Sequence, residues 1–239
     1  MKQTLIGFFI LFIAILALCL FYDYPAMLHG VPQGAHVWRQ SDCMAMTQNY
    51  QQFNLPFLQP ATYNLQSVNG NVAGEFPVFY FIAAQFKNAV FALRFIHTII
   101  FFAGILATYF IAFYFLQRRF LSMLCPMLLF TSPLLVFYGN NFLSDVPALS
   151  FAFIGWAIFL NAHKKENLLW LTIAFLCFAF AGLLKASEMI NFAIAFIFVI
   201  KSRKISIKFL LPFAFCLLPL CWYFYAKQYN KQNYDHYYF

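Results

Sequence analysis

Long apolar runs constrain the fold of this chain more than any other feature of the sequence. A helix needs about 20 mostly apolar residues to cross the hydrocarbon core of a membrane, so runs of this length predict transmembrane helices. Charged residues make up only 9% of the chain, whereas soluble domains carry about 25%. The sequence therefore predicts an all-α, polytopic membrane protein with about seven transmembrane helices. The apolar runs are roughly 4–22, 91–116, 120–138, 146–162, 168–184, 189–200 and 209–226.

The charges between these runs predict an orientation. The first run is long and lacks a small-residue cleavage site, so we interpret it as an uncleaved span rather than a signal peptide. Cytoplasmic loops of membrane proteins are enriched in Lys and Arg, which places the N-terminus and the short basic loops in the cytoplasm. The predicted inner basic residues are Lys2, Arg118, Arg119, Lys164, Lys165, Lys201, Arg203, Lys204 and Lys208. The predicted outer acidic residues are Asp23, Asp42, Glu75, Asp145, Glu188 and Asp235, with only Glu166 inside.

Several classes of site are disfavoured by the sequence. The formal charge of +8 does not predict a nucleic-acid partner, because the basic residues do not cluster on one surface. The six cysteines form no CxxC pair, and all but Cys43 lie in apolar runs, where cysteine usually behaves as a small hydrophobe. The histidines are scattered and form no metal-ligand motif, and no phosphate-binding loop is present. We therefore expect neither a metal nor another cofactor.

The first outer loop, 23–90, is the longest polar segment of the chain. The spacing of apolar residues over 37–53 predicts an amphipathic helix on the membrane surface, with Ser41 as a possible start and Asp42 in its first turn. Segment 54–74 is rich in Asn, Gln, Pro and Gly and predicts an irregular loop. Segment 77–86 is apolar but too short to cross, so we expect an interfacial helix with Pro77 in its first turn.

Asp42 is the first candidate for chemistry. One interpretation makes it a helix cap or an ion-pair partner of Arg39, three residues earlier. The other makes it a carboxylate general base at the boundary of water and membrane, where partial desolvation raises its basicity. Arg39 could hold Asp42 ionised or bind a phosphate through its planar fork of donors. Glu75, in GEFP, has two interpretations as well. It either is solvated near lipid headgroups or lines a cavity that it shares with Asp42.

Two further charged residues stand at predicted outer ends of spans. Asp145 is either a helix cap or part of a polar corner with Asn140, Asn141 and Ser144 that could bind a sugar or a phosphate. Lys185, which precedes Glu188 in GLLKASEMIN, either extends to the membrane surface or meets an anion such as phosphate.

The quoted segments resemble a known family. The loop carries WRQSDCMAMTQNYQQFNL and then EFPVFYFIAAQF, which resemble the first periplasmic loop of bacterial GT-C membrane glycosyltransferases. The relevant members are those related to glycosyltransferase family 39, namely the protein O-mannosyltransferases and the aminoarabinose transferases of lipid A. Two later segments, NNFLSDVPALSF and GLLKASEMINF, resemble weaker motifs of the same family.

The resemblance implies an enzyme of the bacterial inner membrane with its active face in the periplasm. Such an enzyme transfers a hexosyl or pentosyl group, with inversion, from a polyprenyl-phosphate donor to a hydroxyl acceptor. By position, Asp42 matches the general base, while Arg39, Glu75, Asp145 and Lys185 match donor- or substrate-binding residues. The implied partners are the lipid-linked donor, membrane lipids and a lipid, glycan or protein acceptor.

The chain also departs from the family. Cys43 stands where the family commonly has Thr, and family members are typically longer, with further spans. We therefore expect 1–239 to be a single GT-C-like transmembrane domain that corresponds to the N-terminal half of such an enzyme. The alternatives are a non-catalytic membrane protein, either transporter-like or lipid-binding, and an inactive remnant of the enzyme. A transporter is disfavoured because the sequence has no internal repeat and its ionisable residues gather on one predicted face.

Overall fold

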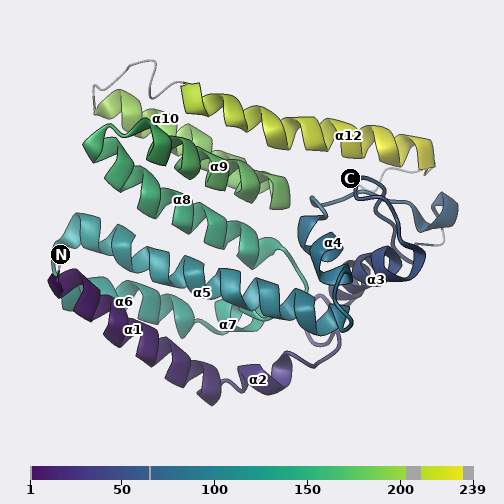
Figure 1. Ribbon diagram of the computed structural model, residues 1–239, viewed down its shortest axis with the longest axis horizontal. Helices are drawn as coiled ribbons and strands as arrows, with labels where there is room; N and C mark the ends of the chain where they lie inside the picture. The colour runs from purple at the N-terminus through teal and green to yellow at the C-terminus, as the bar shows by residue number, and fades with distance from the viewer. Residues whose placement is uncertain (1, 65, 203–210, 234–239) are drawn as a thin grey trace.

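The computed structural model describes residues 2–64, 66–202 and 211–233, and the described chain is helical (Figure 1). This confirms the all-α class: the described residues contain no strand, and an isolated bridge joins Ala61 and Asn71. Short 3₁₀ helices are η1 (Val68–Gly70), η2 (Ala186–Met189) and η3 (Leu211–Cys216). The α-helices are α1 (Lys2–Phe21), α2 (Tyr24–Met27), α3 (Val37–Phe53), α4 (Val78–Ala84), α5 (Ala89–Leu116), α6 (Arg119–Phe130), α7 (Pro133–Gly139), α8 (Asp145–Lys165), α9 (Leu168–Leu184), α10 (Ile190–Lys201) and α12 (Leu217–Asn233).

The centre of the bundle is α8, which packs between α5 and α9 (Figure 1). The contact with α5 is close, since a Cβ added at Gly104 would lie 2.5 Å from the Cβ of Ser150. Small residues at helix crossings let backbones approach in this way. The contact with α9 and α10 is aromatic and is built around Phe159, Phe175 and Phe178, all fully buried. Edge-to-face ring contacts of this kind add stability beyond the area that they bury.

The structure supports fewer membrane-length helices than the seven predicted. Helices α5 and α8, with 28 and 21 residues, are long and apolar enough to cross a membrane. Helices α6 and α7 qualify only as a pair, and the chain bends by 68° between them. The apolar part of α1, Ile6–Phe21, is a shorter helix. Helices α9 and α10 have 17 and 12 residues, so they rise about 25 and 18 Å against a hydrocarbon core of about 30 Å.

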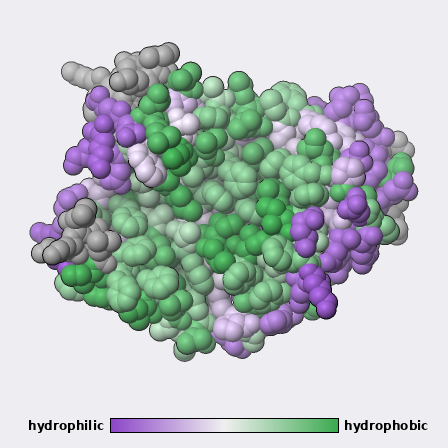
Figure 2. All heavy atoms as spheres, in the orientation of Figure 1, coloured by the Kyte–Doolittle hydropathy of each residue, from purple (hydrophilic) through white to green (hydrophobic). Residues whose placement is uncertain are grey.

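The surface has the polarity of a membrane protein. Figure 2 shows apolar residues across the middle of the visible face and hydrophilic residues towards its two ends. Large apolar side chains are openly exposed on several helices, among them Phe120, Leu128 and Phe224. Exposed apolar area of this extent marks a lipid or protein contact surface. The surface and the two to three apolar helices are therefore compatible with membrane association.

Some of the predicted features lie outside the described residues. They are the start of the apolar run at 209–226 and the charged residues Arg203, Lys204, Lys208 and Asp235.

A helix over 37–53 is confirmed as α3, but its predicted start at Ser41 is wrong. Its predicted amphipathic character is not seen, because the polar Gln40, Thr47 and Asn49 are buried while Trp38 and Phe53 are exposed. The helix begins at Val37, after His36 in a left-handed conformation (φ 55°). The buried side chain of Gln40 explains the early start, because its Nε2 donates to the carbonyls of Gln33 at 2.9 Å and Ala35 at 2.7 Å. Asp42 consequently lies in the second turn of α3, beyond the helix end where a carboxylate would act as a cap.

The helix predicted over 77–86 is present as the shorter α4, and Pro77 is its N-capping residue instead of part of its first turn. Its placement at a membrane interface stays a prediction. The described residues of the intervening segment 54–74 are irregular, as predicted, apart from η1 and isolated bridge residues.

The last helix, α12, holds the end of the irregular loop. The Asn230 side chain accepts from the Ala73 amide and donates to the Ala73 carbonyl, both at 2.7 Å and both buried. The Trp222 indole donates to the Gly74 carbonyl at 3.1 Å. These bonds satisfy backbone groups that would otherwise be buried without partners, at about 1–3 kcal/mol each. They fix the chain immediately before Glu75.

Candidate functional site

A chain of ion pairs joins four of the charged residues singled out in the sequence. The Arg39 Nη2 atom lies 3.1 Å from Glu75 Oε1 and 3.2 Å from Asp145 Oδ2. The Lys185 Nζ atom lies 2.7 Å from Asp145 Oδ1. We call Arg39, Glu75, Asp145 and Lys185 the charge cluster. Residues separated by more than a hundred positions in the sequence thus meet at one point of the fold.

Each member of the charge cluster is placed by a helix end or a fixed turn. Arg39 lies in the first turn of α3, and Asp145 is the first residue of α8, where the helix dipole favours a carboxylate. Lys185 follows the last turn of α9 in extended backbone (φ −150°). Glu75 stands between the segment clamped by α12 and the start of α4. These ends gather on the side of the molecule where α3 and α4 lie (Figure 1).

Glu75 is held by more than the arginine. The Tyr80 hydroxyl donates to Glu75 Oε2 at 3.0 Å, and the Ser144 hydroxyl donates to the same oxygen. Tyr80 also contacts Cys43 Sγ at 3.2 Å. Both Glu75 oxygens therefore accept hydrogen bonds, and the carboxylate ties together α3, α4 and the start of α8. Sequence reasoning missed Tyr80, although its place one turn after Pro77 was a usable signal.

The charge cluster borders a cavity of about 320 Å³. Arg39, Asp42, Glu75 and Lys185 all line it. Asp145 is not among the lining residues and contacts the two cations from the side. The remaining wall is largely apolar or aromatic and includes Trp38, Met46, Val72, Tyr80, Leu184 and Tyr223. The cavity thus combines a charged wall with an apolar wall, as a site for an amphiphilic ligand requires.

The charge states of the neighbouring groups follow from burial and from the carboxylates. Partial burial lowers the pKa of Arg39, but the carboxylates of Asp145 and Glu75 outweigh it, so the pKa is raised. Burial raises the pKa of the Cys43 thiol, and the Glu75 carboxylate raises it further. Burial raises the pKa of Tyr80 as well, with added contributions from Cys43 and Glu75. Cys43 and Tyr80 are therefore neutral at physiological pH.

The structure brings only part of the predicted polar corner to the charge cluster. Asn140 and Asn141 are buried and make structural bonds: Asn140 donates to the Tyr24 carbonyl at 3.3 Å, and Asn141 accepts from the Phe142 amide at 2.6 Å. Asp145 of that corner belongs to the charge cluster, and Ser144 reaches it through Glu75. Asn140 and Asn141 are not among the residues that line the cavity described above, and the binding of a sugar or a phosphate by this corner stays a prediction.

Glu188 also lies apart from the cluster and accepts a side-chain bond from Asn191 at 2.8 Å. Across the described part of the chain, no group of three or more His, Cys, Asp and Glu side chains is arranged to hold a metal ion.

No family model, curated protein or solved structure matches this chain. A functional assignment therefore depends on the geometry of the cavity and on the resemblance of the loop motifs. All five residues that the resemblance singles out lie in or beside the cavity. Four of them line it, and Asp145 forms ion pairs with two of those four.

Proposed function

We propose that the chain is a membrane glycosyltransferase of the GT-C type. It would transfer a sugar from a polyprenyl-phosphate-linked donor to a hydroxyl acceptor at the outer face of the inner membrane. The observation that supports the proposal is the convergence of Arg39, Asp42, Glu75 and Lys185 on one cavity. The seven-span, N-terminus-inside arrangement belongs to the same proposal. In that arrangement the cavity faces the periplasm, at the level where a polyprenyl phosphate presents its head.

Asp42 is the proposed general base. By the resemblance, Asp42 matches the general base of the family. The Glu75 carboxylate accepts from Arg39, Tyr80 and Ser144, and the Asp145 carboxylate accepts from Arg39 and Lys185. These bonds suit them to holding cations in place. Asp42 lines the cavity from α3, and a base must come within hydrogen-bond reach of the proton that it removes.

Arg39 and Lys185 are the proposed contacts of the donor phosphate. In the transfer step, the acceptor hydroxyl gives its proton to the Asp42 carboxylate, and its oxygen bonds to the anomeric carbon from the side opposite the phosphate. The bond from that carbon to the phosphate oxygen breaks, and the electron pair stays on the phosphate. Cations placed beforehand next to the leaving oxygen stabilise the charge that develops there. Their carboxylate partners keep both side chains in position in the absence of donor.

The apolar wall suits the rest of the donor. Trp38, Met46 and Leu184 line the cavity beside the charged residues. The aromatic face of Trp38, which is 61% exposed, is a surface on which a sugar ring can pack, while the aliphatic side chains suit the first isoprene unit. A phosphate with an apolar chain on one side and a sugar on the other matches this division of the wall.

Lipid binding without transfer is the competing function. This function is favoured because both cations of the cluster are already paired with carboxylates. Such pairs stabilise a binding site whether or not a reaction takes place in it. A non-catalytic protein with this cavity would bind the lipid phosphate and would not depend on Asp42 as a base.

The test compares sugar transfer by the wild-type chain, Asp42→Asn and Asp23→Asn in membranes supplied with a panel of polyprenyl-phosphate pentoses and hexoses. Asp23 is a matched control, because it is an exposed acidic residue of the same loop that does not line the cavity. Its left-handed backbone (φ 53°) is one that asparagine adopts readily.

We expect Asp42→Asn to lower transfer by about 10²–10⁴-fold, the usual contribution of a general base, and Asp23→Asn to keep it. Equal transfer by both variants would exclude Asp42 as the base. Photo-crosslinking of a donor analogue to wild-type protein that shows no transfer would establish lipid binding in place of catalysis.

A further inference from the structure

A second recess opens at the end of the bundle away from the cavity. It is a groove of about 730 Å³ between α5, α8 and α9. Helix α8 connects the two sites, since it begins at Asp145 in the charge cluster and ends at Lys165 beside the groove. With 21 residues in α8, the two sites are about 30 Å apart, the thickness of a hydrocarbon core.

The wall and the mouth of this groove differ in chemistry. The wall is formed by Phe110 of α5 and by Ala157, Ile158 and Ala162 of α8. These are the two helices that are long and apolar enough to cross a membrane, so the wall is apolar where acyl chains would lie. The mouth is formed by Lys165, Asn161, Asn167 and Trp170. A tryptophan beside polar groups at a helix end is typical of the membrane–water interface.

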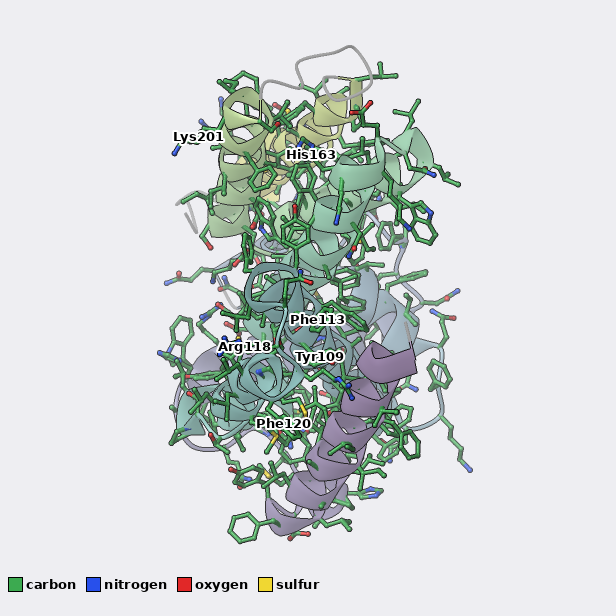
Figure 3. All side chains as sticks on the ribbon, turned by 90° about the vertical axis from the view of Figure 1, so that its left-hand side faces the viewer. Tyr109, Phe113, Arg118, Phe120, His163 and Lys201 are labelled. Carbon is green, nitrogen blue, oxygen red and sulfur yellow. The ribbon has the colours of Figure 1, made fainter. Side chains whose placement is uncertain are left out.

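The surroundings of the mouth are basic. Arg118 and Arg119 lie at the turn between α5 and α6, and Lys164 and Lys165 end α8. Figure 3 looks onto this end of the molecule and shows Arg118 from the turn between α5 and α6, His163 from α8 and Lys201 from α10. Glu166 belongs to the same turn and does not line the groove. Helix α9 starts at the mouth, capped by Asn167 at 3.2 Å from the Trp170 amide, and the positive end of its dipole faces the same region.

We propose that this groove binds an anionic phospholipid. Its phosphate would lie against Lys165 and the asparagine amides, with one acyl chain along Phe110 and Ile158. The charge favours an anionic headgroup over a zwitterionic one, because a lysine near an anionic surface contributes to binding through both contact and long-range attraction. The apolar wall favours a lipid over free phosphate. The site is separate from the cavity and does not depend on the proposed glycosyltransferase activity.

The test measures quenching of Trp170 fluorescence by lipids brominated on the acyl chain. The full chain is reconstituted in vesicles of phosphatidylcholine that contain either brominated phosphatidylglycerol or brominated phosphatidylcholine. Subtracting the signal of Trp170→Phe isolates the contribution of Trp170 from the other tryptophans. The ratio of the two quenching constants then gives the preference of the groove for the anionic lipid.

Lys165→Gln and Lys164→Gln are the matched pair. Both lysines are exposed and adjacent at the end of α8, and only Lys165 lines the groove. We expect Lys165→Gln to reduce the preference by about fivefold, the effect of one basic residue at a membrane surface, and Lys164→Gln to reduce it much less. Ala157→Phe, which fills the wall, should abolish the preference while the helical circular dichroism is retained.

Two results would overturn the proposal. Equal quenching of wild-type Trp170 by the two brominated lipids would show that the groove has no headgroup preference. Equal effects of Lys164→Gln and Lys165→Gln would show that the attraction is general surface electrostatics instead of a site in the groove.

Discussion

The contact between Asp145 and Lys185 makes a quantitative prediction about the charge cluster. Asp145→Asn removes the carboxylate that accepts from Lys185 at 2.7 Å and from Arg39 at 3.2 Å. Arg39 keeps Glu75 as a partner, whereas Lys185 loses the carboxylate that the described structure places beside it. We therefore expect Asp145→Asn to destabilise the fold more than Lys185→Met, which removes one pair and keeps an unbranched apolar stem.

The magnitude follows from the exposure of the side chains. Hydrogen bonds to charged groups contribute about 1.5–3 kcal/mol when buried, and fully exposed ion pairs about 0.2–1 kcal/mol. Asp145 and Lys185 are 32% and 34% exposed, so water screens the pair substantially. A coupling free energy of about 1 kcal/mol is therefore expected between Asp145 and Lys185, within a loss of about 2 kcal/mol for Asp145→Asn alone.

A double-mutant cycle measures this coupling. The free energy of unfolding is obtained in mixed micelles from circular dichroism for the wild type, Asp145→Asn, Lys185→Met and the double variant. A parallel cycle that pairs Asp145→Asn with Lys87→Met is the control, because Lys87 is exposed and lies outside the charge cluster. The control should give no coupling. A coupling below about 0.3 kcal/mol for the Asp145–Lys185 cycle would refute the view that this ion pair holds the cluster together.

Two further predictions concern the supports of the cavity. Asn230→Ala should lower the free energy of unfolding by about 2–4 kcal/mol, because it leaves the buried amide and carbonyl of Ala73 without partners. Gln228→Ala, at an exposed position of the same helix, is the control. Equal effects of the two substitutions would show that the bonds from Asn230 to Ala73 do not stabilise the loop. Burial and the nearby Glu75 raise the pKa of Cys43, so a smaller fraction of this thiol is thiolate at pH 8. Cys43 should therefore be alkylated more slowly than a cysteine introduced on the exposed face of α3 by Ser41→Cys in a Cys43→Ala background. Equal alkylation rates would contradict the raised pKa.

Local features of this fold could be predicted from the sequence because they depend on nearby residues. The apolar periodicity over 37–53 and the runs that became α5 and α8 each carry their own signal. The start of α3 was missed because it depends on a buried glutamine that binds the turn before the helix. Hydropathy also does not register where a run is broken or short: the run over 120–138 bends by 68° between α6 and α7, and the runs that became α9 and α10 form helices of 17 and 12 residues.

The candidate site was predictable only in part. The motifs of the first outer loop identified Arg39, Asp42 and Glu75, the later segment GLLKASEMIN identified Lys185, and all four residues line one cavity. The position of Asp145 beside both cations was not predictable, because it depends on how α8 packs against α3 and α9. The bonds from α12 to the loop were equally hidden, since nothing near Ala73 in the sequence signals a partner at Asn230.

The clamp of α12 on the loop also has a consequence for biosynthesis. The chain is made from its N-terminus, and Ala73 meets Asn230 across 157 positions of sequence. Segments that carry Arg39 and Glu75 must therefore wait for nearly the entire described chain to emerge before their final positions are fixed. Contacts of such long range form late, because the intervening chain must be ordered first. Assembly of the cavity is thus expected to be the last event of folding, after the helices of the bundle have already associated.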